Sequence, residues 1–266
     1  MKRRVIKLFF VLPAAATLLY AAGPDPIDLL RRSVQAEEDN LARAASYLYT
    51  EDVTHSTVEG DLVLHTESQR YEVIFLGGKP YFRLKSRDGL PLPPDEEAAE
   101  KARMDAVAND RRASLFGSSS PAERPRISVV YRILLDSHEV RLIGEDTLQG
   151  RAVWILEAIP KRKDGPGGLN EKETRALRVK VWIDQDTLLR VRLDAEAVRS
   201  AGRLDRGAQL SYRFARQTDG VWLVQQIIYR VPEGRSKAGQ RYHETDQSYS
   251  NYHKFQVESS LQSPSQ

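Results

Sequence analysis

The stretch LRVKVWIDQDTLLRVRLDAEA, residues Leu177–Ala197, alternates apolar and polar side chains on both sides of a short interruption. A period of two is typical of a β-strand with one covered face and one face in water. If residues 184–188 connect two such strands, all the apolar side chains of the hairpin fall on one face. The expected pairs are Ile183–Leu189, Val181–Val191, Val179–Leu193, Arg178–Asp194 and Lys180–Arg192. The sequence therefore predicts an antiparallel hairpin whose apolar face is either ordinary core or the wall of a ligand cavity.

Similar strand patterns occupy most of the chain on either side of this hairpin. Asp219–Gly220 joins two of them in a sequence typical of a two-residue turn, which places Tyr212 opposite Ile227 and Leu210 opposite Tyr229. The predicted strands cover residues 51–58, 61–67, 70–76, 80–87, two segments within 139–160, 177–184, 189–197, 208–216, 221–231 and one or two segments within 240–257. Together they predict a mainly β (α+β) protein of about eleven antiparallel strands.

Two helices are expected beside the strands. Asp25 and Pro26 form a helix start, and apolar residues then recur at helical spacing as far as Tyr47, with a polar gap at Glu37–Glu38. A second helix over residues 94–113 is polar almost all round, which is typical of a surface position. Residues 127–135 fit a short helix or a strand, and the pattern favours the helix slightly. Apolar positions of the first helix are Ile27, Leu30, Val34, Leu41, Ala45 and Leu48.

Residues 1–22 have the pattern of a secretory signal peptide: a basic start, an apolar run from Leu8 to Tyr20 and small residues at Ala21–Ala22. The run has 13 residues, fewer than the roughly 20 needed to cross a bilayer. Loss of its four basic residues lowers the formal charge from +3 to −1, so the mature chain has no basic excess for nucleic acid. We expect a single domain over residues 23–258, a disordered tail at 259–266, and a protein that is soluble in the periplasm.

Sequence motifs for catalysis or metal binding are absent. The chain has no cysteine, which excludes a thiol nucleophile, a thiolate metal site and a lipidated cysteine. No nucleophile elbow, phosphate-binding glycine loop or zinc-protease pair is present. We therefore expect no enzyme activity, cofactor or metal. An enzyme would have to draw on convergent polar groups, for which His243, Glu244, Asp246 and His253 are the candidates.

Three tryptophans lie inside predicted strands, at positions 154, 182 and 222. Trp182 falls on the polar face opposite Arg190, where a cation–π contact is expected. Packing explains each tryptophan better than ligand contact does.

Several phrases of the sequence resemble the outer-membrane lipoprotein-sorting proteins, the half-barrel carriers of the LolA/LolB type. They are YEVIFLGGKPYFRL, RLIGEDTLQGRAVWILEAIP, KVWIDQDTLLRVRL, DGVWL and YSNYHKFQV, and the resemblance extends from about Asp25 to Val257. It implies an incomplete antiparallel β-barrel, closed by an N-terminal amphipathic helix and an inserted helix over its open face. The concave apolar side of such a barrel receives acyl chains.

This resemblance implies a monomeric periplasmic carrier of lipoprotein acyl chains or other lipid, which works with sorting components of the inner or outer membrane. Each methylene group of an acyl chain that moves from water into such a cavity contributes about 0.8 kcal/mol to the free energy of binding. The alternative is an envelope-stress sensor or protein-interaction domain of the same fold with a filled core. The expected cavity residues are Val179, Val181, Ile183, Leu189, Val191, Leu193, Tyr212, Phe214, Ile227 and Tyr229, and the expected lid residues of the first helix are Leu30, Val34 and Leu41.

Overall fold

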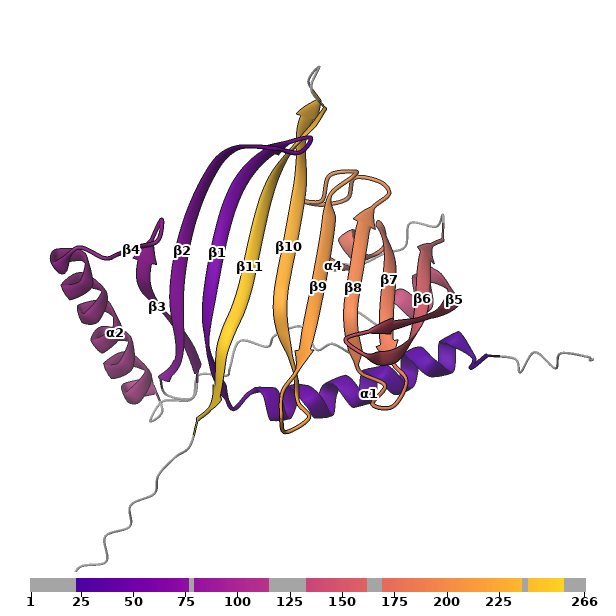
Figure 1. The fold of residues 1–266 in the computed structure, drawn as a ribbon, viewed down its shortest axis with the longest axis horizontal. Helices are drawn as coiled ribbons and strands as arrows, with labels where there is room; N and C mark the ends of the chain where they lie inside the picture. Colours follow the sequence, from indigo (N-terminus) through magenta and orange to yellow (C-terminus); the bar gives the residue numbers. More distant parts are fainter. Residues whose placement is uncertain (1–22, 77–78, 115–132, 162–168, 236–238, 256–266) are drawn as a thin grey trace, which may run out of the picture.

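The computed structural model describes residues 23–76, 79–114, 133–161, 169–235 and 239–255. Eleven strands form one antiparallel sheet in the order β4-β3-β2-β1-β11-β10-β9-β8-β7-β6-β5 (Figure 1). The sheet curves but does not close, because β4 and β5 lie at its two opposite edges. The predicted mainly β, incomplete-barrel fold is confirmed. Its strands are β1 Tyr47–Glu59, β2 Leu62–Leu76, β3 Lys79–Arg87, β4 Leu90–Pro91, β5 His138–Leu148, β6 Arg151–Pro160, β7 Leu177–Asp184, β8 Arg190–Ala197, β9 Gln209–Arg216, β10 Trp222–Arg235 and β11 Gln240–Lys254.

Strand β2 differs from its prediction, because it is one continuous strand where two were expected. The polar residues Ser68 and Gln69 do not break it. Gln69 is paired with Val53 of β1 and with Arg87 of β3, so this stretch of backbone has strand partners on both sides. One or two strands were predicted within residues 240–257, and the described part of this region forms one long strand, β11.

The hairpin formed by β7 and β8 has a register shifted by two residues from the predicted one. Val181 pairs with Leu193, and Lys180 pairs with Asp194 instead of Arg192. A shift of two residues keeps the same side chains on each face, so the alternation alone cannot distinguish the two registers. The observed register places opposite charges across the strands, which favours it over the predicted one.

A β-bulge changes the faces at the start of β8. Trp182 pairs with Arg192 and Ile183 pairs with Arg190, which leaves Val191 as the extra residue. The predicted contact between Trp182 and Arg190 is therefore wrong. Instead, the guanidinium carbon of Arg192 lies 4.3 Å from the ring centroid of Trp182. Arg190 points to the opposite side of the sheet, where it contacts Glu37 of the first helix.

Register defines the two faces of the sheet. We call the face that carries Leu156, Val181, Leu193 and Tyr212 the helix face, and the face that carries Glu157, Lys180, Asp194 and Ser211 the polar face. In the β9–β10 hairpin, Tyr212 pairs with Ile227 and Leu210 with Tyr229, as predicted. The connection is longer than predicted: it spans residues 217–221, with Gly220 at a φ of 83°.

Helix α1, Pro26–Ala44, packs on the helix face and runs across the lower ends of the strands (Figure 1). It begins as predicted, with the Asp25 carboxylate accepting a hydrogen bond from the Ile27 amide at 2.9 Å. Its first half contributes Leu29 and Leu30 to the main core. That core also contains Leu134, Leu156, Ala158, Val179, Val181, Ile183 and Ala195.

The inserted helix is present as α2, Pro94–Ser114, but its predicted position over the open face is wrong: it lies beside β3 and β2 at one edge of the sheet (Figure 1). The Tyr81 hydroxyl and the Leu84 amide both donate to its Glu100 carboxylate. The chain is helical at residues 133–137, which overlap the end of the ambiguous region 127–135, and a short helix α4 covers Leu169–Thr174. Among the described residues, no helix is long and apolar enough to cross a membrane. The predicted signal peptide and the tail at 259–266 lie outside the described residues.

Candidate functional site

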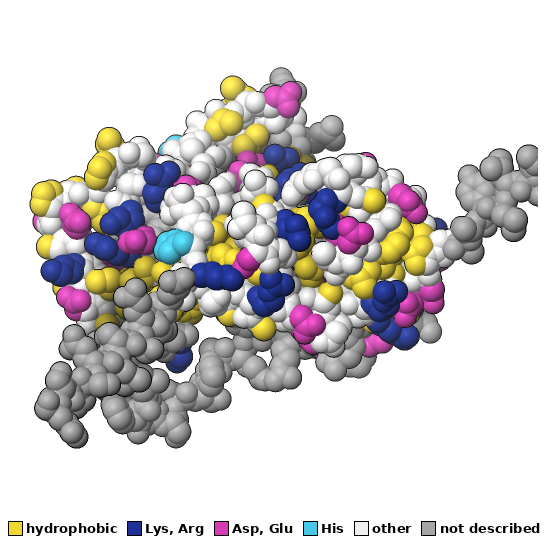
Figure 2. Space-filling model, turned by 60° about the horizontal axis from the view of Figure 1, so that its bottom comes forward, with side chains coloured by type: hydrophobic (Ala, Val, Ile, Leu, Met, Phe, Trp, Pro, Cys, Tyr) yellow, Lys and Arg dark blue, Asp and Glu magenta, His cyan; other side chains and the backbone are white. Residues whose placement is uncertain are grey.

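A hollow of about 270 Å³ lies between the second half of α1 and the helix face, and we call it the α1 hollow. Most of its wall is apolar or aromatic. Seen from the lower side of Figure 1, where α1 lies, hydrophobic side chains form patches among charged ones (Figure 2). The residues that line the hollow are Glu37, Asn40, Leu41, Ala44, Tyr47, Tyr49, Leu189, Arg190, Phe214, Trp222, Leu223, Val224, Tyr249 and Tyr252.

Polar contacts hold the second half of α1 to the turn between β9 and β10. The Asn40 amide donates to the Trp222 carbonyl at 2.7 Å and accepts from the Trp222 amide at 2.8 Å. Arg43 donates to the Asp219 carbonyl at 2.8 Å. The helix is therefore fixed by apolar packing in its first half and by these hydrogen bonds near its end, and its second half covers the hollow.

Asp219 joins three parts of the chain at this end of the sheet. Its carboxylate pairs with Lys254 of β11 and accepts hydrogen bonds from the Tyr47 hydroxyl at 2.8 Å and the Val221 amide at 3.2 Å. These contacts, with that of Lys254 the strongest, hold the pKa of Asp219 well below its usual range. The carboxylate is therefore ionised at neutral pH.

Tyrosines form much of the remaining wall. The rings of Tyr49 and Tyr252 have centroids 5.4 Å apart, and that of Tyr249 lies 5.6 Å from Tyr49. Burial raises the pKa of Tyr249 and Tyr252, so both hydroxyls stay protonated at neutral pH. Trp222 is 2% exposed, and its buried indole N–H has no hydrogen-bond partner among the described residues.

One buried ion pair lies in the wall. Nη2 of Arg190 is 3.2 Å from Oε2 of Glu37, and the two side chains are 17% and 7% exposed. The guanidinium carbon of Arg190 also lies 5.1 Å from the ring centroid of Phe214 and 5.9 Å from that of Tyr212. The hollow thus combines an apolar aromatic wall with a cation, which suits a ligand with an apolar chain and a polar end.

The predicted cavity residues are divided between core and hollow. Val179, Val181 and Ile183 are buried in the main core against Leu29 and Leu30, and Leu193 packs against that cluster. Val191 is buried in a second cluster with Trp182. Leu189 and Phe214 line the α1 hollow, and Tyr212, Ile227 and Tyr229 are half-buried on the helix face.

The predicted lid residues are similarly divided. Leu30 is 2% exposed within the main core, and Val34 packs against it. Leu41 is 49% exposed at the rim of the hollow. The structure therefore places only the last of the three beside open space.

Several wall residues were not foreseen from the sequence. Glu37 had a signal, because it interrupts the apolar stripe of α1 at a position that faces the sheet. Arg190 had none, because only the bulge turns it onto the helix face. Asn40 lies far from Trp222 in sequence, and Tyr47 and Tyr49 lie far from Tyr249 and Tyr252, so the sequence pattern does not show that the fold brings them together.

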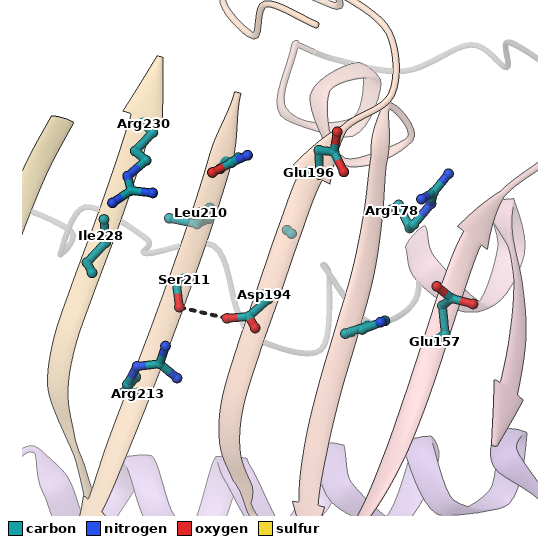
Figure 3. A pocket seen from close by; sticks show the side chains of 12 residues that line it. Glu157, Arg178, Asp194, Glu196, Leu210, Ser211, Arg213, Ile228 and Arg230 are labelled. Atoms are coloured by element: carbon teal, nitrogen blue, oxygen red, sulfur yellow. Dashed lines mark hydrogen bonds between the residues drawn. The ribbon is translucent and has the colours of Figure 1, made fainter. Parts of the chain in front are cut away.

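A larger hollow of about 500 Å³ lies on the polar face, and we call it the polar trough (Figure 3). Its charges alternate across the strands: Lys180 is paired with both Glu157 and Asp194, and Asp194 accepts a hydrogen bond from Ser211 at 2.7 Å. Charged side chains that compensate one another are typical of a face in contact with water. Despite its size, the trough is a poor site for an apolar ligand.

The residues considered for an enzyme do not converge. Neighbours in a strand point to opposite faces, which separates His243 from Glu244, and Asp246 binds Gln226 on the polar face. His253 lies ten residues along β11 from His243, roughly 33 Å by strand rise. Among the described residues, no group of three or more His, Asp or Glu side chains could hold a metal ion. His138 is buried, and burial lowers its pKa, while its Nε2 contacts the Leu177 carbonyl at 2.8 Å.

No protein-family model matches the chain, and no curated protein matches it. Solved structures do. A DUF1329 family protein from Desulfovibrio piger is 20% identical, with 87% of this chain and 94% of that chain covered and a TM-score of 0.38. A putative outer membrane lipoprotein-sorting protein domain from Vibrio parahaemolyticus is 12% identical, with 85% and 93% covered and a TM-score of 0.37. A LolA superfamily protein from Nitrosomonas europaea is 13% identical, with 88% and 96% covered and a TM-score of 0.32.

These matches include the lipoprotein-sorting group that the sequence phrases resemble.

Proposed function

We propose that this protein is a periplasmic binding protein that holds acyl chains of a lipid or lipoprotein between α1 and the sheet. The α1 hollow is the observation that carries this proposal, because its wall is largely apolar and aromatic. Its volume of about 270 Å³ is near the lower end of the range for small-molecule sites, roughly 300–1,000 Å³. A full acyl chain therefore requires α1 to shift, and binding selects the shifted state.

The contacts of α1 suit such a shift. The first half of the helix is buried in the main core, whereas the second half is held mainly through side chains, those of Asn40, Arg43 and Glu37. A hydrogen bond that water can replace contributes only about 1 kcal/mol to the free energy of folding, so these contacts are easier to break than the core packing of the first half. The second half of α1 is the lid in this proposal.

Residues 1–22 support export, and the proposal places the mature protein in the periplasm after their removal. The expected role is in outer-membrane lipoprotein sorting, as a monomer without catalytic activity. Components of the inner or outer membrane would load and unload it.

The proposal is tested by filling the hollow. Ala44 lines it, whereas Ala42 is exposed on the same helix. Ala44→Trp and Ala42→Trp therefore add the same side chain inside and outside the proposed site. In a titration with a fluorescent fatty acid, Ala44→Trp is expected to lose binding by about tenfold or more and Ala42→Trp to bind like the wild type. Equal binding by all three folded proteins would contradict the site.

A protein-interaction domain with a filled core is the second candidate. It is favoured by the first half of α1, where Leu29 and Leu30 are 1% and 2% exposed and pack in one cluster with Val179 and Val181. No uptake of the fatty acid by the wild type would favour this candidate over the carrier.

A further inference from the structure

The Glu37–Arg190 pair is an unusual component of an apolar site. Glu37 lies in the stripe of α1 that faces the sheet, and its side chain is 7% exposed. Removing two charges from water costs several kcal/mol per ion, and apolar residues in their place are often equally stabilising. Stability alone therefore gives no reason for a carboxylate at this position.

The location of Arg190 gives a functional reason. The bulge in β8 turns its guanidinium onto the helix face, beside Phe214 and in the wall of the α1 hollow. Trp222, in the same wall, has an indole N–H without a partner among the described residues. A guanidinium stays charged at every working pH, and its planar fork matches a carboxylate. The hollow therefore has a fixed cation within an otherwise mainly apolar lining.

We propose that the α1 hollow binds an acyl chain that ends in a carboxylate, with Arg190 as the anchor of the head group. In the unliganded protein the Glu37 carboxylate occupies this anchor at 3.2 Å. The ligand carboxylate takes its place, and Glu37 moves to water as α1 shifts. One anion replaces another, so Arg190 keeps a partner in both states.

This inference rests on the proposed function and narrows it. Neutral acyl esters and amides offer an oxygen acceptor but no charge, and they cannot replace Glu37 on equal terms. A free fatty acid is the simplest ligand with the required chemistry. The preferred cargo is accordingly an anionic single-chain lipid.

Matched ligands separate the head group from the chain. Laurate and 1-dodecanol have the same chain length, and at pH 8 only laurate is charged. Hydrogen bonds to charged groups are stronger than neutral ones, so the wild type is expected to bind laurate about tenfold more tightly in calorimetric titrations. Glu37→Gln removes the competing carboxylate and is expected to increase this preference.

Arg190→Gln leaves Glu37 buried beside a neutral partner, so the double variant Glu37→Gln/Arg190→Gln is measured as well. The single variant Arg190→Gln and the double variant are both expected to bind laurate and dodecanol with equal affinity. Arg192→Gln is the control, because Arg192 stacks on Trp182 on the other side of the sheet and should leave the preference unchanged.

The outcomes distinguish this inference from the function on which it rests. A wild type that binds both ligands equally, or a double variant that keeps the preference for laurate, would overturn the role of Arg190 and leave acyl binding intact. Failure of the wild type to bind either ligand would overturn the proposed function itself.

Discussion

Asp184 shows how a single buried carboxylate fixes the loop between β7 and β8. It is 0% exposed, pairs with Arg151, and accepts hydrogen bonds from the amide and the hydroxyl of Thr187, both at 2.8 Å. Burial raises the pKa of Asp184, but the hydrogen bonds from Arg151 and Thr187 outweigh it and bring the pKa below its usual value. The ionised carboxylate is thus the form that the fold requires.

Asp184→Asn is expected to lower the free energy of unfolding by about 3 kcal/mol, because it leaves buried donors facing a neutral amide. Since the pKa of Asp184 is lower in the folded than in the unfolded state, its ionised carboxylate stabilises the fold fully above the unfolded-state pKa of about 3.9. This stabilisation is lost as the pH falls from there through the folded-state pKa. Urea unfolding between pH 7 and pH 3 measures both effects. Asp186→Asn is the control, since that side chain is 82% exposed. Equal loss in the two variants would contradict the role of Asp184.

Glu51 has the opposite pH dependence. It is 5% exposed, and burial raises its pKa despite a hydrogen bond from Tyr249. Its contribution is fully present below the unfolded pKa and is lost as the pH rises through the raised folded-state pKa. Glu51→Gln is therefore expected to increase stability by roughly 1 kcal/mol at pH 8 and to make little difference at pH 4. A variant less stable than the wild type at pH 8 would show that the charge is needed.

At the residue scale, the sequence predicted correctly which side chains of β7 lie on the apolar face of the sheet, but not those of the first residues of β8. The bulge at Val191 places Arg190 on the side of the sheet opposite to the one expected from a regular hairpin. A bulge depends on the local backbone pairing and leaves no mark on the alternation of side chains. The ion pair in the α1 hollow therefore could not be derived from the pattern.

At the scale of elements, the two halves of α1 have different roles, and two leucines test the difference. Leu30→Ala is expected to cost about 3 kcal/mol of unfolding free energy, because Leu30 is 2% exposed in the main core. Leu41→Ala removes a side chain that is 49% exposed at the rim of the hollow, and is expected to cost less than about 1 kcal/mol. Chemical unfolding of both variants measures this, and similar losses would contradict a packed first half and an exposed second half.

Element types were predictable because their periods are clear. The start of α1, the span of α2 and the β9–β10 pairing follow from caps, helical spacing and a turn sequence. The predicted register of β7 and β8 was wrong by two residues, because the predicted and the observed register place the same side chains on each face. Cross-strand charge, with Lys180 opposite Asp194, was the one cue that separated them.

At the scale of the whole molecule, the open eleven-stranded sheet was predicted, but the position of the hollow was not. The hollow depends on where α1 crosses the sheet, and that is fixed by contacts such as Asn40 with Trp222, which lie 182 residues apart in sequence. The expected cavity over Val179 and Val181 is filled by Leu29 and Leu30. Open space remains further along α1, over β8 to β11 and the start of β1.

Native mass spectrometry of the mature protein, purified from a bacterial periplasm without detergent, tests acyl binding most directly. We expect a fraction of the molecules to carry an extra mass that lipid extraction identifies as an acyl chain, and we expect Ala44→Trp to remove it while Ala42→Trp retains it. An unliganded mass for the folded wild type, together with no uptake of added fatty acid, would contradict the account and leave the α1 hollow as part of an interaction domain.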